Sequence, residues 1–104
     1  MVKNVIIENT DTVILNPSSD SVIAGVGLYL CNASPEDDVI NVHLIQIGDN
    51  PQNKNTIVKD LTIKAGETFE FGYEKLIIND GEQLVVSSEN GGRVNATVTY
   101  IDIT

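Results

Sequence analysis

Hydrophobic residues recur along this chain in short segments, and each segment ends at a cluster of Asn, Asp, Gly, Ser or Pro. The alternation is most regular from residue 22 to residue 30, where every second side chain is apolar. A period of two is typical of a β-strand with one buried face, and the residues of the clusters are those that form turns. The pattern therefore predicts short strands throughout the chain and no long helix.

About eight short strands are expected, which predicts an all-β, antiparallel β-sandwich of the immunoglobulin-like or jelly-roll-like kind. In one segment the alternation changes phase, because Gln46 falls on the apolar side while Ile45 and Ile47 fall opposite. This predicts either a β-bulge or burial on both faces. The expected strands lie at residues 2–8, 12–15, 22–30, 39–47, 57–63, 68–72, 76–78, 84–88 and 94–101.

The phase of the alternation also predicts which side chains fill the core. These are Val26, Leu28, Leu30, Val42, Leu44, Phe69, Phe71, Leu84, Val86, Val98 and Tyr100. A chain of 104 residues is long enough for one such core and too short for two. We therefore expect residues 1–104 to form a single domain.

Composition strengthens the β interpretation and narrows the range of partners. Thirteen Ile and twelve Val stand against four Ala and seven Leu, and β-branched side chains favour strands. The net charge of −9 disfavours nucleic acid and anionic lipid surfaces. No apolar run has the length of a membrane span, and the first residues lack the apolar segment of a signal peptide. A protein made and kept in solution is expected.

Few residues of this chain offer chemistry, and we predict no catalytic residue, no metal site and no cofactor. His43 is the only histidine and is expected on the strand face that points to solvent or to a neighbouring subunit. Cys31, the only cysteine, is expected to pack as a small hydrophobic residue. The run Glu36-Asp37-Asp38 lacks the ligand spacing of a calcium loop, and we expect it to be a solvated acidic loop.

Two features of the sequence bear on glycans. The segments that begin at Asn32 and Asn95 match the N-glycosylation sequence, and we expect both to be unused. Sugar-binding sites generally stack sugars on exposed aromatic rings, and the alternation leaves only Tyr29 and Tyr73 as possible platforms.

The ends of the chain carry apolar residues on faces that a two-layer sandwich cannot bury. Val2 and Ile6 lie opposite Val5 and Ile7, and Ile101 and Ile103 lie opposite the inward residues of the last strand. We predict that these positions contact another chain, with Val2, Val5, Ile7, Ile101 and Ile103 as the interface residues. The alternative is that a bulge or twist returns them to the core, or that the terminal strands cover each other.

Four segments resemble small β-sandwich virion proteins of tailed bacteriophages of the cyanophage and marine-phage type. Tyr29-Leu-Cys-Asn-Ala-Ser34 is similar to that family's strand ending in a Cys-Asn-Thr/Ser turn, and residues 63–68 resemble its Ile-Pro-Ala-Gly-Ser-Thr turn. Residues 75–84 resemble its Lys-Ile-Val-Leu-Glu-Ala-Gly-Asp-Lys-Leu hairpin, and residues 96–101 its closing strand. Lys64 stands where the family often has Pro, and Glu82 where it usually has Asp.

This resemblance implies a non-enzymatic virion structural protein, foremost a capsid decoration or cement protein that stabilises subunit junctions. It would be made in the bacterial cytoplasm and located in the virion, with the major capsid protein or another virion protein as partner. The resemblance also implies a homotrimer, because decoration proteins often sit at three-fold positions. Two alternatives stay open: a head-to-tail or tail-associated structural protein, and a carbohydrate-binding or host-receptor-binding module.

Overall fold

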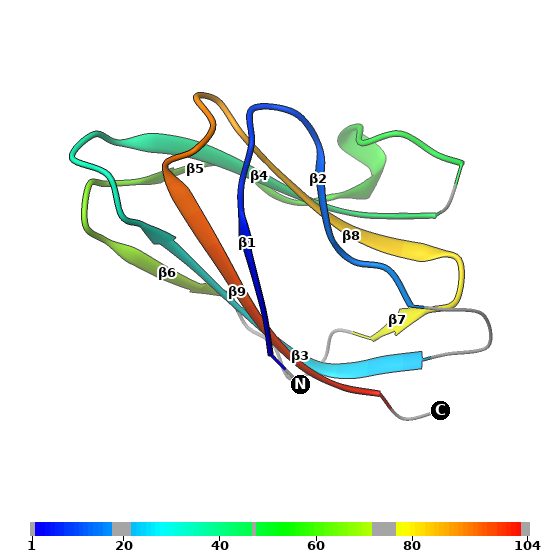
Figure 1. The fold of residues 1–104 in the computed structure, drawn as a ribbon. Helices are drawn as coiled ribbons and strands as arrows, with labels where there is room; N and C mark the ends of the chain where they lie inside the picture. The colour runs from blue at the N-terminus through cyan, green and yellow to red at the C-terminus, as the bar shows by residue number, and fades with distance from the viewer. Residues whose placement is uncertain (1, 18–21, 47, 72–76, 103–104) are drawn as a thin grey trace.

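A computed structural model describes residues 2–17, 22–46, 48–71 and 77–102, without the side chains of residues 24–26, 71 and 102 (Figure 1). These residues form strands and one short 3-10 turn, so the predicted all-β class is confirmed. The elements are β1 (Val2–Ile6), β2 (Thr12–Leu15), β3 (Val22–Asn32), β4 (Asp38–Gln46), η1 (Asn53–Asn55), β5 (Thr56–Ile63), β6 (Thr68–Phe71), β7 (Ile78–Asn79), β8 (Glu82–Ser88) and β9 (Val94–Asp102).

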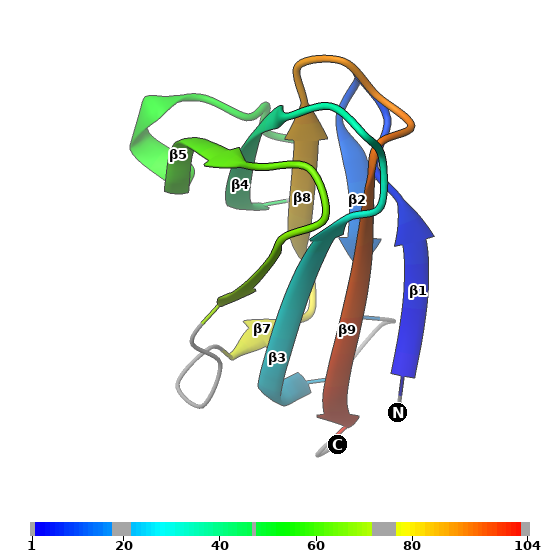
Figure 2. The same cartoon turned by 90° about the vertical axis from the view of Figure 1, so that its left-hand side faces the viewer.

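The strands form two antiparallel sheets that face each other. Sheet A has the order β1-β9-β3-β6, with β7 also paired to β3, and sheet B has the order β2-β8-β4-β5. Because β1 and β2 lie in different sheets, the order is not that of an immunoglobulin sandwich, whose first two strands share a sheet. The chain instead crosses repeatedly between a five-stranded and a four-stranded sheet, which is the jelly-roll arrangement (Figures 1 and 2).

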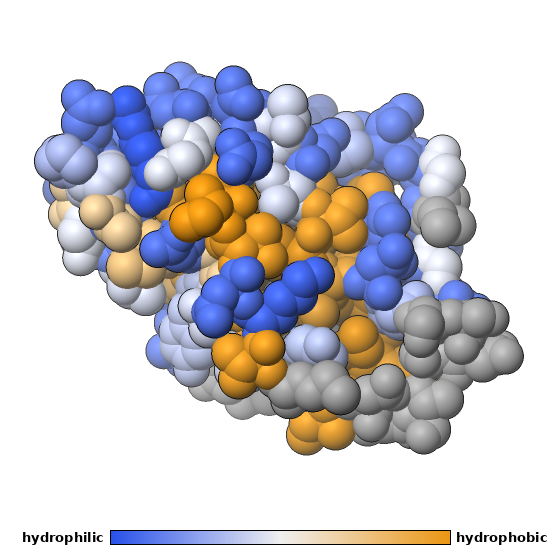
Figure 3. Space-filling model, in the orientation of Figure 1, coloured by the Kyte–Doolittle hydropathy of each residue, from blue (hydrophilic) through white to orange (hydrophobic). Residues whose placement is uncertain are grey.

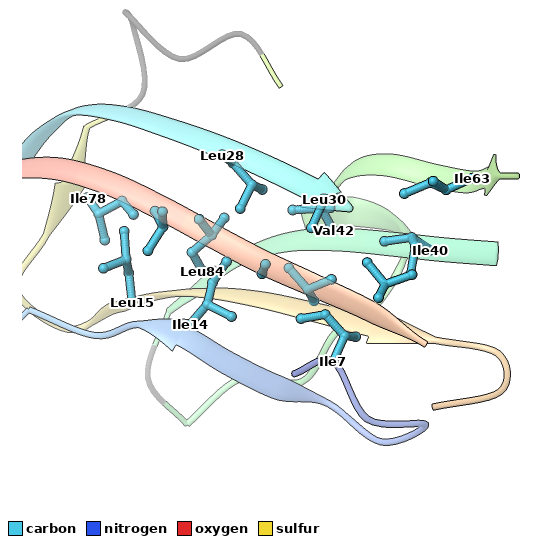
Figure 4. Close-up of a cluster of buried hydrophobic side chains, with 14 of the residues drawn as sticks. Ile7, Ile14, Leu15, Leu28, Leu30, Ile40, Val42, Ile63, Ile78 and Leu84 are labelled. Carbon is cyan, nitrogen blue, oxygen red and sulfur yellow. The ribbon is translucent and has the colours of Figure 1, made fainter. Parts of the chain in front are cut away.

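The core lies between the two sheets and is made mainly of Ile, Leu and Val (Figure 4). Of the predicted core residues, Leu28, Leu30, Val42, Leu84, Val86 and Val98 are buried, and Leu44, Phe69 and Tyr100 are partly buried against them. The predictions for Val26 and Phe71 concern side chains outside the described set. Ile7, Ile14, Ile40, Ile63, Ile78, Val94 and Ala96 are further core members that the prediction omitted.

The change of phase in β4 corresponds to burial on both faces together with an irregularity on one side. The pairing of β4 with β8 runs without a shift from Ile40 to Gln46, whereas its pairing with β5 shifts between Ile40 and His43. Ile45 is only 5% exposed although it points away from the core between the sheets. Because β4 lies inside sheet B and η1 lies against it, its outer side chains are covered as well. Ile47 lies outside the described residues.

Candidate functional site

The side of sheet A that faces away from sheet B is the main candidate for an interaction surface. Its side chains alternate with the inward ones along each strand, and we call this set the outer face. It consists of Val2, Asn4 and Ile6 of β1, Asn95, Thr97, Thr99 and Ile101 of β9, Tyr29 and Cys31 of β3, and Thr68 and Glu70 of β6. Among these described residues only Glu70 is charged, in a chain of net charge −9.

Strand register brings four of these side chains into one row across the whole sheet. Asn4 pairs with Thr97, Thr97 with Tyr29, and Tyr29 with Glu70. The Thr97 hydroxyl donates a hydrogen bond of 2.9 Å to the side-chain oxygen of Asn4. The row therefore places an amide, a hydroxyl, an aromatic ring and a carboxylate side by side on neighbouring strands.

A shallow hollow of about 280 Å³ lies between β1 and β9 beside this row. Asn4, Val5, Ile6, Asn95 and Thr97 line it, and four of these five belong to the outer face. The hollow thus combines amide and hydroxyl groups with the apolar side chain of Ile6. It is open to solvent, as a contact surface is, and it does not enclose a reacting group.

The terminal strands place three apolar side chains in solvent on this face. Val2 is 66% exposed, Ile6 49% and Ile101 62%. β1 and β9 do pair with each other, yet this pairing leaves the side chains of the outer face uncovered. Figure 3 looks at the edge of the sandwich that carries β1 and β2, where hydrophobic residues gather in the middle and lower part and hydrophilic residues lie above.

Two of the predicted interface residues lie elsewhere. Ile7 is completely buried in the core, so the prediction that it contacts a partner is wrong. After β1 ends, the Ile7 amide donates to the Val94 carbonyl and the Gly92 amide donates to the Ile7 carbonyl, which holds the side chain between the sheets. Val5 points inward and is partly buried against the core. Val2 and Ile101 are exposed, and Ile103 lies outside the described residues.

His43 lies on the strand face opposite Val42 and Leu44, as expected, but little of it is exposed, so the expectation that it faces solvent is wrong. The alternative, that it faces a neighbouring subunit, stays a prediction. His43 is 9% exposed on the outer side of sheet B, and its Nδ1 is buried with no hydrogen-bond partner. Val85, its partner on β8, is 1% exposed, so the imidazole lies in an apolar setting. Burial lowers the pKa of His43, Asp11 opposes this shift, and Lys59 adds to it. The lowered pKa favours the neutral form of the imidazole.

The predicted acidic loop is used for internal bonds, and one of its residues is not solvated. Glu36 pairs with Arg93 at 2.7 Å, and the Asp37 carboxylate accepts the Ala65 amide. Asp38 is 1% exposed, so its placement in a solvated loop is corrected. Burial raises the pKa of Asp38, but hydrogen bonds from Ser88, Asn90 and two backbone amides lower it by more. The described residues contain no group of three His, Cys, Asp or Glu that could hold a metal ion.

Asn32, at the end of β3, is a buried structural residue whose importance the sequence did not reveal. Its amide nitrogen donates to the carbonyls of Glu36 and Ile63, and its side-chain oxygen accepts the amide and hydroxyl of Ser34. With no exposed surface it offers no glycosylation site. The Asn-Ala-Ser spacing gave the available signal, because Asn two residues before Ser is typical of a side-chain-stabilised turn.

Of the two tyrosines considered as sugar platforms, Tyr29 is 39% exposed on the outer face. Tyr73 lies outside the described residues. Cys31 is half-buried on the same face, paired with Asn95 on one side and Thr68 on the other. The outer face therefore has one aromatic side chain at its centre.

No protein-family model matches this chain, and searches of curated proteins and of solved structures find no match either. Within the described residues, no helix has the length and hydropathy of a membrane span. The function must therefore be argued from the surface itself.

Proposed function

We propose that this protein is a non-enzymatic structural protein of a bacteriophage virion that binds the capsid as a decoration protein. The observation that carries the proposal is the outer face of sheet A. One charged residue among its described side chains, in a chain of net charge −9, marks this face as different from the rest of the surface. Depletion of charge is the compositional mark of the central part of protein interfaces.

The fold suits this task. A sheet of five hydrogen-bonded strands backed by a packed core keeps its outer side chains in fixed positions, so little conformational entropy is lost on binding. Jelly rolls occur in viral capsid proteins, which supports the proposal by analogy, and they also occur in lectins. The four sequence segments that resemble phage virion proteins favour a capsid role over a lectin role.

The partners in this proposal are the major capsid protein, or another virion protein, and further copies of this chain. The virion is the location, and a head-to-tail or tail position is the alternative within the same class. A trimer is the assembly that the resemblance implies. The exposed residues Val2, Ile6 and Ile101 support self-association, because contiguous apolar surface is rare on monomers.

Binding to purified empty capsids tests this proposal. Tyr29→Lys places a charge at the centre of the outer face and should weaken co-sedimentation with capsids at least tenfold. Ile57→Lys is the matched control, because Ile57 is equally exposed at 39% but lies on β5 of the other sheet. Absence of binding by the unaltered protein, or equal binding by both variants, would contradict the proposal.

A sugar-binding module is the second candidate, favoured by the row of Asn4, Thr97 and Tyr29 beside the hollow. Amides and hydroxyls can bond sugar hydroxyls while the Tyr29 ring stacks against a sugar face. A glycan array with the isolated protein separates this candidate from the first. Specific binding that Tyr29→Ala abolishes and Tyr29→Phe retains would establish it, and an array with no signal would remove it.

A further inference from the structure

The outer edge of β1 is an unpaired strand edge in the part of the chain that the structure describes. β1 is the last strand of sheet A and has β9 on one side only (Figure 2). The Ile7 amide donates to the Val94 carbonyl, which sets the direction of the backbone groups on this strand. Because these groups alternate in an antiparallel pair, Lys3 and Val5 bond toward β9, and Val2, Asn4 and Ile6 present their N–H and C=O groups to the outside.

We propose that a second copy of this chain pairs with this edge, β1 against β1 and antiparallel, about a two-fold axis at Asn4. The inference goes beyond the proposed function, because it gives a dimer where the resemblance implies a trimer, and it joins the outer faces of the two copies edge to edge. The two copies of sheet A then form one continuous ten-stranded sheet, with β1 and its symmetry mate at the centre. An interface of this kind is isologous, so each copy contributes the same residues.

The register follows from the backbone. Three positions of β1 point outward, and an axis at Asn4 pairs Asn4 with Asn4 and Val2 with Ile6 of the second copy. This arrangement makes three hydrogen-bonded pairs, or about six N–H···O=C bonds, whereas a shift by two residues makes about four. Directly opposite residues share a face, so the exposed apolar side chains of Val2 and Ile6 cover each other.

Charge favours a second copy at this edge. In the proposed register Lys3 lies opposite Val5, so no like charges face each other across the pair. The outer faces of the two copies continue into each other, and their described charges, the two Glu70 side chains, lie on β6 at the far edges.

The other sheet edges are less suited to pairing. β5 carries Lys59 and Asp60, and Asp60 has a φ of 51°, which interrupts a regular strand. β2 has only four residues, with a register shift between Val13 and Leu15. β6 is also four residues long and carries Glu70. Irregularity and charge of this kind protect edges from pairing. β1 carries one charge, Lys3, but combines a regular register with exposed apolar residues.

Engineered disulfides test the register in the full-length protein, with Cys31 replaced by Ser. Asn4→Cys should form a disulfide-linked dimer, because opposed residues lie about 5.5 Å apart between Cα atoms. Val2→Cys alone should not, because the two copies of residue 2 are about 13 Å apart along the strands. A mixture of Val2→Cys and Ile6→Cys proteins should form a mixed dimer. Absence of the Asn4 dimer, or equal dimers from Val2→Cys alone, would overturn the register.

The solution mass tests the dimer itself. Sedimentation should give twice the 11.3 kDa chain mass, and Ile6→Lys should raise the dimer dissociation constant at least tenfold. Ile57→Lys, on the far edge of sheet B, should leave that constant unchanged. A monomer, or a trimer, would overturn the inference.

The tests of the dimer and of the proposed function have separate outcomes. A dimer that does not bind capsids would retain the inference and remove the decoration role, whereas a monomer that binds capsids through Tyr29 would do the reverse.

Discussion

Two buried polar side chains, Asn32 and Asp38, join the loops at one end of the sandwich. Each is at most 1% exposed, and each bonds to segments that are distant in sequence. Asn32 reaches the carbonyl of Ile63, and Asp38 accepts the hydroxyl of Ser88 at 2.7 Å. Such groups are stabilising only while all partners are present, because an unpaired buried polar group is costly.

We predict that Asn32→Ala lowers the free energy of unfolding by about 2–4 kcal/mol, because two carbonyls and the Ser34 groups lose their partner. Urea denaturation followed by circular dichroism measures this. Asn95→Ala is the control, because Asn95 is half-exposed on the outer face, and its cost should stay within about 0.5 kcal/mol. Equal costs would show that the Asn32 bonds contribute little.

His43 predicts a pH dependence of stability. Its pKa is lowered in the folded chain, so the unfolded chain takes up a proton first as the pH falls through about 6.5. The free energy of unfolding should therefore fall between pH 7.5 and pH 5.5, and the loss should end below the folded pKa. The urea midpoint of unfolding at each pH in this range measures the loss of stability. His43→Gln should flatten the dependence of stability on pH. An unchanged profile in that variant would place the titration on other groups.

At the scale of elements, the turn between β8 and β9 packs directly against the segment between β1 and β2. Gly91 and Gly92 both have positive φ, at 77° and 72°. A Cβ added at Gly91 would lie 2.8 Å from the Asn9 amide nitrogen, whereas one added at Gly92 would meet nothing within 4 Å. A substitution at Gly92 therefore tests backbone strain alone, and the same substitution at Gly91 tests backbone strain together with close packing.

We predict that Gly92→Ala costs about 1–2 kcal/mol, from the left-handed backbone alone. Gly91→Ala should cost at least about 1 kcal/mol more, because the backbone of Asn9 must also move. Thermal or urea denaturation of the two variants measures the difference. If the two costs were equal, the turn would yield easily and the contact between the two segments would be loose.

For the whole molecule, net charge opposes self-association while the outer face favours it. Two copies of a −9 chain repel each other, and dissolved salt screens this repulsion. We predict that the dimer dissociation constant falls as sodium chloride rises from about 20 mM to about 200 mM, where the Debye length shortens from about 20 Å to below 10 Å. Sedimentation equilibrium measures it. A constant that rises with salt would indicate an interface held by ion pairs, contrary to the uncharged outer face.

The sequence indicated part of the candidate site. The alternation placed Val2 and Ile6 on one face of the first strand and Ile101 on the outward face of the last, and all three are exposed. It did not place Asn4, Thr97 and Tyr29 in one row, because that row depends on how strands 1, 9 and 3 pair. Local patterning gives the face of a residue within its own strand and contains no information on the neighbouring strand.

The sequence by itself determined the all-β class, the strand segments and most inward positions, because β-branched residues, a period of two and turn residues act locally. Only the tertiary structure decided the jelly-roll order, since strand pairing depends on contacts between distant segments. It also buried Ile7, which was expected to contact another chain, and His43, which was expected on an outward face. Ile7 lies just past the end of β1 and shares the inward side of that strand with Val5. His43 lies on a strand that other elements cover on both faces. Burial is a property of the assembled layers, and a single strand does not specify it.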